Sequence, residues 1–402
     1  MLSELALPGN LAGRTRVFVV LDAYLPGFKS GGPLRTIANM VDRLDELSFF
    51  IFTRDRDVGS GRPFTDVNIN AWNNVGNAKV FYSKGMGLAA IRRQILAAKP
   101  DLLYLNSFFS YSTIKVLLLR RGGLIPSLPT ILAPRGECSP GGLRLKSFKK
   151  RLYLTLAARL LYRDLLWQAS SDLERSEIEQ ALGIGLRVRV ATDLPPREVS
   201  LPPQSKLPKR SGAATFVYLS RISEKKNLHF LLALLSRIKG EVELEVWGPV
   251  EDQKYWNRCE ELIRSLPDNV RTVMKGPVQH ERVSEVLGRC HFFVLPTLSE
   301  NFGHAILEAW MSGCPVLISD QTPWRGLRTT NTGWDIALTQ VQQWCEALQD
   351  CVDMDTATFA GLSESSRQFA MTWTSSSNID RANYALFEEA LGKPLNLAAH
   401  VI

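Results

Sequence analysis

Three observations predict the fold class of this chain. Apolar runs typical of strands buried on both faces alternate with stretches of helical periodicity. The alternation occurs in two series, separated by residues 191–212, which contain five prolines and few large apolar residues. A chain of 402 residues is also longer than one ordinary core accommodates. Together they predict an α/β protein of two Rossmann-like domains, each with a doubly wound parallel sheet.

The first series begins with a buried strand at residues 16–22, followed by a loop that ends in Gly31 and Gly32. A helix is predicted from Pro33 onward, because proline suits the first helical turn. A glycine-rich turn between a strand and a helix can cradle a phosphate with its amides. The loop lacks the GxGxxG pattern, which disfavours a dehydrogenase-type dinucleotide fold and leaves a plain tight turn as the alternative.

The first series continues with further strands and helices. Strands are predicted at residues 48–53, 79–82, 101–106, 129–133, 165–169 and 187–191. Helices are predicted at residues 88–98, 113–121 and 173–182. Asp55 and Asp57 have the spacing of a metal-binding Asp-x-Asp pair, but they stand in a polar loop, so we expect a solvated turn there.

The second series follows the proline-rich stretch. Its strands are predicted at residues 215–220, 243–247, 270–275, 291–296 and 315–319. The predicted organisation is a first domain at 1–192, a linker at 193–212, a second domain at 213–372 and a terminal segment at 373–402.

Composition and charge narrow the class of protein. The formal net charge of +8 favours polyanionic partners, so nucleic acid, an anionic membrane surface and a phosphorylated substrate all stay open. The six cysteines form no C-x2-C pair, which disfavours a zinc site or a disulfide framework. The apolar runs are too short to span a membrane, and the first residues do not resemble a signal peptide. We therefore expect a cytoplasmic protein.

Two carboxylates, Glu300 and Glu308, flank the predicted start of a helix after the strand at residues 291–296. Eight helical residues would separate them by roughly 12 Å, about the span from the ribose to the sugar of a nucleotide-sugar. Asn301, Phe302 and Gly303 would present first-turn amides to an oxygen-rich or anionic group, and Gly303 leaves room for its approach. The alternative is an ordinary strand and helix with two surface carboxylates.

Arg221 and Lys226 follow the first strand of the second series. A guanidinium and an ammonium at this place can stabilise negative charge that develops on a departing phosphate. Basic residues at a helix start oppose the helix dipole, and a bound anion would relieve that cost. Ordinary surface charges are the alternative.

The stretch at residues 295–316 resembles the E-x7-E signature of retaining group 1 glycosyltransferases, glycosyltransferase family 4, whose fold is GT-B. The resemblance extends to Thr322-Pro-Trp324 and Gly333-Trp334 and, more loosely, to the N-terminal half. It implies two domains facing each other across a cleft, with a terminal helix at 373–402 crossing back to the first domain. It also implies a nucleoside diphosphate sugar as co-substrate, no bound metal and no other cofactor.

The resemblance assigns roles by position. It implies that Arg221 and Lys226 hold the donor diphosphate, Glu300 the transferred sugar and Glu308 the ribose. Further donor contacts fall on these residues: Gly31, Gly32, Gly248, Val278, Asn301, Phe302 and Gly303.

One departure from the family concerns its first-domain histidine, since no histidine precedes His229 here. At the corresponding place, residues 133–137 resemble a Pro-Arg-Gly variant of a subset of the family. Arg135 is assigned to a phosphate or the acceptor and Glu137 to a sugar hydroxyl, with a structural role for either as the alternative.

The expected function is transfer of a hexose-like sugar, with retention, from a nucleoside diphosphate sugar to a hydroxyl of a saccharide acceptor. The resemblance implies a lipid-linked acceptor in surface polysaccharide synthesis. Two alternatives stay open: a nucleotide-sugar epimerase or hydrolase of the same fold, and a basic nucleic-acid-binding protein.

A membrane surface is a further expected partner. Residues 143–163 interleave leucines with seven cations and contain no acidic residue, typical of a basic amphipathic helix on the inner face of a cell membrane. A core helix whose cations face water is the alternative.

Overall fold

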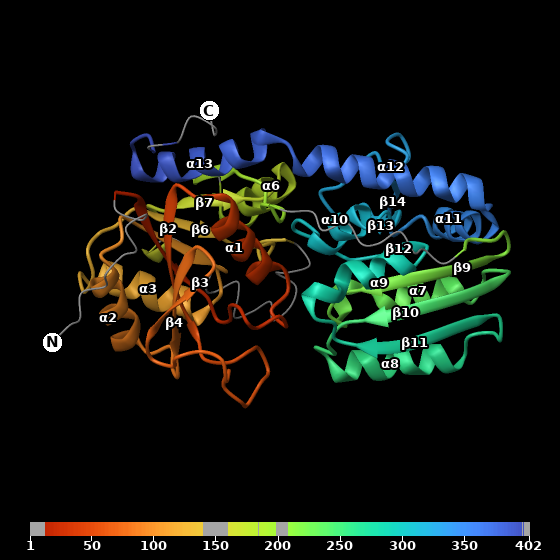
Figure 1. The fold of residues 1–402 in the computed structure, drawn as a ribbon, viewed down its shortest axis with the longest axis horizontal. Coiled ribbons are helices and arrows are strands. Elements are labelled where there is room, and N and C mark those ends of the chain that lie inside the picture. The colour runs from red at the N-terminus through yellow and green to blue at the C-terminus, as the bar shows by residue number, and fades with distance from the viewer. Residues whose placement is uncertain (1–12, 140–159, 184, 198–207, 396, 398–402) are drawn as a thin grey trace. The chain divides into compact units, whose positions relative to one another are not determined.

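The computed structural model describes residues 13–139, 160–183, 185–197, 208–395 and 397 (Figure 1). The chain forms two compact units. The first consists of residues 1–197 and 376–402, and the second of residues 198–375.

The first unit is built on an eight-stranded sheet with the order β3-β4-β2-β1-β5-β6-β7-β8. All neighbours are parallel except β3, which pairs antiparallel with β4 at one edge. The strands are β1 (Thr15–Val20), β2 (Leu47–Arg54), β3 (Trp72–Val75), β4 (Ala78–Ser83), β5 (Leu102–Asn106), β6 (Thr130–Ala133), β7 (Leu166–Ala169) and β8 (Arg187–Val190). Their described helices are α1 (Gly32–Arg43), α2 (Leu88–Ala98), α3 (Tyr111–Arg121) and α6 (Asp172–Leu182).

The second unit has a six-stranded, fully parallel sheet with the order β11-β10-β9-β12-β13-β14. The strands are β9 (Ala213–Leu219), β10 (Glu241–Trp247), β11 (Val270–Gly276), β12 (Phe292–Leu295), β13 (Val316–Ser319) and β14 (Gly333–Ile336). The α-helices are α7 (Leu228–Leu235), α8 (Gln253–Arg264), α9 (Val283–Arg289), α10 (His304–Met311), α11 (Val341–Asp353) and α12 (Thr356–Thr374). Two short 3-10 helices are η2 (Glu224–Lys226) and η3 (His280–Arg282).

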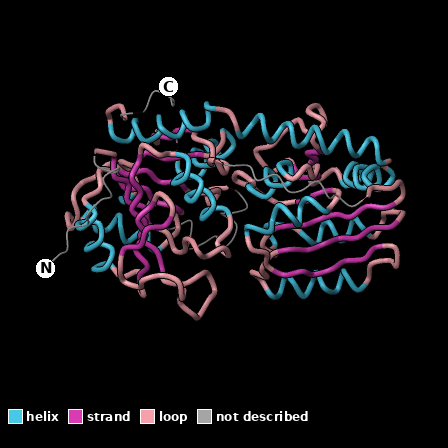
Figure 2. Tube along the Cα trace, viewed as in Figure 1, coloured by secondary structure: helices cyan, strands magenta, loops and turns pink. Residues whose placement is uncertain are grey.

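The predicted fold class is confirmed in both units, and Figure 2 shows strands flanked by helices throughout. Two strands were not predicted, β3 and β14. Strand β3 reads Trp-Asn-Asn-Val and is an edge strand, so its polar residues carry no buried pattern. Strand β14 reads Gly-Trp-Asp-Ile and is also an edge strand, beside β13.

The last helix, α13 (Ser377–Leu391), belongs to the first unit. It packs against β6, and its fully buried Phe387 contacts the rings of Phe49 and Tyr104. At its start, Asp380 accepts two hydrogen bonds from the guanidinium of Arg43 on α1, at 2.7 and 2.8 Å.

The proline-rich stretch does not begin as exposed chain. Asp193 and Leu194 are 3% and 0% exposed, and both belong to the first unit. Further along, the ammonium of Lys209 donates to the carbonyls of Val352 and Met354 in the second unit. The ends of this stretch are therefore integrated into the two units.

Candidate active site

Glu300 lies in a loop of the second unit between β12 and α10. Because α10 begins only at His304, Glu300 and Glu308 do not share a helix, and the helical separation of roughly 12 Å does not apply to them. The backbone of Glu300 donates to the carbonyl of Gln321 at 2.8 Å, which ties the loop to the segment after β13.

The carboxylate of Glu300 forms an ion pair with the ammonium of Lys226. Their side chains are 17% and 10% exposed, so water screens the pair weakly. The carbonyl of the preceding residue, Lys225, accepts from the Leu298 amide at 2.8 Å and from the Thr297 hydroxyl at 3.1 Å. Two predicted site residues are thus brought together by direct bonds between their loops.

The environment of Glu300 favours its charged form. Burial alone would raise the pKa of this carboxyl, but Lys226, Lys225 and Arg221 together hold it below its usual value. Glu300 is therefore a carboxylate at neutral pH, acting as a hydrogen-bond acceptor and not as an acid.

Asn227 lies in the turn between η2 and α7. Its φ of 61° and ψ of 37° are left-handed, and it connects η2 directly to α7. Asparagine tolerates this conformation better than other residues with a side chain. The turn places Lys226 at the end of η2, 8% exposed and facing Glu300.

Only glycine fits at position 303, because of the backbone conformation there and because of the atoms around it. It has a φ of 86°, and a Cβ atom there would lie 2.7 Å from Ile306 Cδ1 and 3.2 Å from Glu300 Cγ. The neighbouring Phe302 is 3% exposed, with its ring against Trp324 and Trp373. Phe302 is therefore a core side chain, so any donor contact at this residue falls to its backbone.

Trp324 supports the loop that contains Phe302 and Gly303. Its indole N–H donates to the carbonyl of Phe302 at 2.6 Å, and its ring packs against Trp310 and Trp373. The sequence singled out Trp324 through the family resemblance without assigning it this role. An aromatic cluster thus fixes the backbone that precedes α10.

Arg221 follows β9 and lies at the surface. Its guanidinium donates to Glu251 at 2.7 Å, with both side chains nearly half exposed. Gly248 explains how this segment is placed: a Cβ atom on Gly248 would lie 1.9 Å from the carbonyl oxygen of Ser220, so only glycine allows the approach. Gly248 acts on the strand-end turn that carries Arg221.

Glu308 lies on α10 and faces η3. Its carboxylate is 3.7 Å from Nδ1 of His280, with side chains 20% and 34% exposed. Val278, predicted as a donor contact, precedes η3 and is half-buried against the core of the unit. His280 was not predicted, because no sequence spacing links it to Glu308.

In the first unit, Gly31 precedes α1 with a φ of 66°, and a Cβ atom there would meet no atom within 4 Å. Gly32 is the first residue of that helix. The expectation of a solvated turn at Asp55 and Asp57 is wrong, because both carboxylates are buried. Asp55 is 1% exposed and pairs with Arg56, while Asp57 is 8% exposed and accepts from the amides of Phe28 and Lys29. Asp57 therefore anchors the glycine loop.

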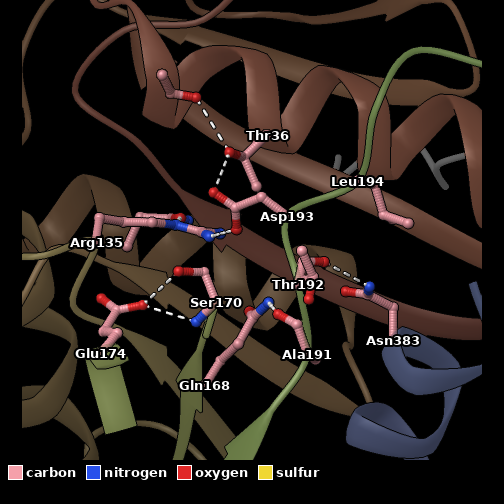
Figure 3. Close-up of polar contacts among 12 residues, drawn as sticks. Thr36, Arg135, Gln168, Ser170, Glu174, Ala191, Thr192, Asp193, Leu194 and Asn383 are labelled. Carbon is pink, nitrogen blue, oxygen red and sulfur yellow. Dashed lines mark hydrogen bonds and ion pairs between the residues drawn. The ribbon is translucent and has the colours of Figure 1, made fainter. Parts of the chain in front are cut away.

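Arg135 is enclosed in a polar network of the first unit (Figure 3). Its side chain, 7% exposed, pairs with Asp193, donates to the Tyr104 hydroxyl at 2.7 Å and reaches Asn106 at 3.3 Å. Asp193 in turn accepts from the hydroxyl of Thr36 on α1 at 2.9 Å. These contacts favour the structural alternative for Arg135.

Glu137 also has partners in its own unit. Its carboxylate accepts from the Ser107 hydroxyl at 2.7 Å and from the amides of Phe108 and Phe109 at 2.6 and 3.1 Å. Beside it, the buried Glu174 accepts from the Gly136 amide at 2.6 Å, and burial raises the pKa of Glu174. Both carboxyl groups shape the loop after β6, and their role was not readable from spacing.

The basic amphipathic helix predicted at residues 143–163 lies largely outside the described residues. In the part of the chain that the structure describes, no helix is long and apolar enough to cross a membrane. Among the same residues, no group of three or more His, Cys, Asp or Glu is arranged to hold a metal ion.

One family model matches part of the chain by sequence. Residues 203–358 match the family model described as glycosyl transferases, group 1. The matched range lies in the second unit and contains Arg221, Lys226, Glu300 and Glu308. No curated protein matches the chain.

Comparison of structures extends over both units. The chain is similar to sucrose-phosphate synthase from Thermosynechococcus elongatus, with a TM-score of 0.72, 16% identity and coverage of 94% of this chain and 100% of the other. It is similar to Anabaena HepE in complex with UDP and glucose, with a TM-score of 0.66, 15% identity and coverage of 94% and 100%. It is also similar to WaaG, a glycosyltransferase involved in lipopolysaccharide biosynthesis, with a TM-score of 0.63, 15% identity and coverage of 92% and 99%. The fold of the two units is of the GT-B type.

Proposed function

We propose that this chain, whose second unit carries the group 1 glycosyl transferase match, is a retaining glycosyltransferase that uses a nucleoside diphosphate sugar. The observation that carries the proposal is the weakly screened pair of Lys226 and Glu300. It combines a cation suited to a diphosphate with a carboxylate suited to sugar hydroxyls, immediately before α10.

The donor would be held by groups from four segments of the second unit. Arg221 and Lys226 neutralise the diphosphate, and the amides at residues 301–303 add dipoles near the start of α10. Glu300 accepts hydrogen bonds from the transferred sugar, and Glu308 from the ribose. Gly248 and Val278 shape the nucleotide side of the site.

The reaction would proceed by attack on the same face of the sugar from which the diphosphate leaves. The acceptor hydroxyl oxygen bonds to the anomeric carbon as the bond to the diphosphate oxygen breaks. The hydroxyl proton passes to the leaving phosphate oxygen, so no protein nucleophile is required. The cations stabilise the charge that develops on the diphosphate, and no metal ion enters the scheme.

The acceptor is proposed to be a saccharide, on a lipid carrier, in surface polysaccharide synthesis. The similar HepE structure is a complex with UDP and glucose, and WaaG is a glycosyltransferase involved in lipopolysaccharide biosynthesis, which supports this class of donor and pathway. From the first unit, the proposal keeps Gly31 and Gly32 as contacts to the acceptor or the diphosphate. It leaves out Arg135 and Glu137, because both are bonded within their own unit.

Separate variants of the two carboxylates test the donor assignment. Glu308→Ala is expected to weaken binding of both free nucleoside diphosphate and nucleotide-sugar. Glu300→Ala is expected to abolish transfer yet bind free diphosphate at least as tightly as the parent, because it leaves Lys226 without its counter-charge. Titration calorimetry with a panel of nucleoside diphosphates measures both; equal affinity losses in the two variants would contradict the division of roles.

Three further measurements test the mechanism, and the last of them separates the alternatives. Replacing Arg221 with Ala is expected to reduce transfer by roughly 100-fold, as the loss of one charge-stabilising donor commonly does. Transfer is expected to survive EDTA. Turnover of the nucleotide-sugar without any acceptor would instead favour an epimerase or hydrolase.

A further inference from the structure

The first unit exposes leucines on two neighbouring helices, α2 and α3. Leu88 and Leu96 on α2 are 45% and 39% exposed, Leu118 on α3 is 48% exposed, and Leu124 just after α3 is 52% exposed. The cores of both helices are already filled by other residues, including the fully buried Ile91, Ile95, Val116 and Leu117. The exposed leucines are therefore additional to what the core requires, and such a group marks an interaction surface.

Cations lie among these leucines on the same face. On α2, Leu88, Arg92 and Leu96 recur every four residues, which is one side of a helix; Arg93 is also exposed, and the exposed Lys99 follows the helix directly. We call these residues, with Leu118, Arg121 and Leu124, the α2–α3 face. The two helices pack against each other, and the guanidinium of Arg92 donates to the carbonyl of Leu124 at 2.8 Å.

The charge of this region is strongly one-sided. From residue 84 to residue 128 the sequence has seven basic residues and a single acidic one, Asp101. Asp101 is engaged by the backbone of Arg16 at 2.8 Å. Asp164 pairs with Arg120 and Arg121, which leaves Arg92, Arg93 and Lys99 as the cations of the face without a carboxylate among the described ion pairs.

We propose that the α2–α3 face docks on an anionic lipid bilayer, with its leucines in the headgroup region and its cations on the lipid phosphates. A surface of mixed aliphatic and basic side chains can lie in the interface of an anionic bilayer without crossing the membrane. A second copy of the chain is disfavoured because two such faces would repel each other. Nucleic acid is disfavoured because the exposed apolar side chains are mainly leucines, with Tyr111 on α3 the one exposed ring among the described residues of these two helices.

This proposal goes beyond the sugar transfer and does not depend on it. It also uses residues other than the basic segment at 143–163, so it stands on the described part of the first unit. If both proposals hold, the docked first unit would keep the enzyme at the surface that carries a lipid-linked acceptor.

Sedimentation with vesicles tests the proposal on the full-length chain. The parent protein is expected to bind vesicles of phosphatidylcholine with one third phosphatidylglycerol, to bind pure phosphatidylcholine much more weakly, and to lose binding as salt rises. Arg92→Gln, Arg93→Gln and Lys99→Asn together are expected to lower affinity for the anionic vesicles by about 10-fold or more. Asparagine is chosen for Lys99 because its φ is 47°.

A matched control removes the same charge elsewhere. Lys254, Arg258 and Arg264 are exposed on or beside one face of α8 in the second unit, among several acidic residues. Changing these three to Gln is expected to leave vesicle binding within about twofold of the parent. An equal loss in both triple variants would overturn the assignment of the face, since only total charge would then matter.

The leucines are tested separately. Leu88, Leu118 and Leu124 changed to Gln are expected to weaken binding to anionic vesicles at constant charge, whereas Leu173→Gln on α6, 41% exposed in the parent, is expected to have no effect. Thermal unfolding of each variant within a few degrees of the parent secures the comparison. Equal binding to neutral and anionic vesicles, or binding of duplex DNA through the same cations without vesicle binding, would overturn the proposal.

Discussion

Replacing Lys226 with Met leaves the buried carboxylate of Glu300 without its ion-pair partner. The variant keeps the length and much of the apolar stem of the side chain, but it removes the ammonium that pairs with Glu300. Loss of one partner of a buried ion pair costs about 3–5 kcal/mol. Because the Glu300 side chain keeps 17% exposure and Lys225 and Arg221 stay nearby, we expect the low end, about 3 kcal/mol.

Thermal unfolding of the full chain measures this cost. For a unit of this size, about 3 kcal/mol corresponds to a lower Tm by roughly 6–12 °C. The double variant Lys226→Met with Glu300→Gln is expected to recover most of the loss, because no unpaired charge stays buried. If the double variant unfolds at the same temperature as the single one, the lost stability does not come from the pair.

The pH dependence has a definite sign. In the parent the pKa of Glu300 is lowered, so its stabilising effect is complete above the unfolded-state pKa of about 4.3 and is lost as pH falls through the folded value. Without Lys226, burial raises the pKa of Glu300, and protonation relieves the variant. The gap in Tm between parent and variant is therefore expected to be widest near pH 7 and to narrow toward pH 4. A gap that widens on acidification would refute the reasoning.

Two further predictions concern the supports of the site. Gly248→Ala is expected to lower stability by about 1–3 kcal/mol and to reduce transfer, because the new Cβ atom collides with the Ser220 carbonyl. The control, Gly361→Ala, lies inside α12, where an added Cβ atom would meet no atom within 4 Å, and it should be neutral or stabilising. Similar losses of stability in both variants would contradict the collision. Trp324→Phe is expected to lower kcat roughly 10-fold with little change in KM for the donor, since the Phe302 carbonyl loses its 2.6 Å hydrogen bond. Trp310→Phe, which removes one of the hydrogen bonds that the Thr332 carbonyl accepts, should lower stability with a smaller loss of kcat, and steady-state kinetics with thermal unfolding measure both effects.

The sequence predicted the strands well where hydrophobic burial alone determines them. Strands such as β1, β2 and β12 contain runs of four consecutive apolar residues because helices cover both faces of a parallel sheet. Strand β3 escaped prediction because an edge strand needs no such pattern, and its partner β4 supplies the order.

The site was predictable as far as charge and spacing reach. Lys226 and Glu300 were singled out by position, and the structure pairs them. The partners that set the environment of each predicted residue were not predictable, because they come from other elements: Glu251 beside Arg221, and His280 beside Glu308. For Asp57 the prediction was wrong, because its polar loop sequence indicated a solvated turn. The structure shows a buried carboxylate that accepts hydrogen bonds from amides distant in sequence.

The position of α13 has a consequence for how the protein is made. The first unit is completed by α13: Phe387 fills its core, Asn383 donates to the carbonyl of Thr192, and Asp380 pairs with Arg43. During synthesis these residues leave the ribosome only after the whole of residues 198–375, a delay of roughly 10–35 s at about 5–20 residues per second. The first unit must therefore wait, with the surface that later receives α13 uncovered, while the second unit is made. The unit translated first is the one that is finished last.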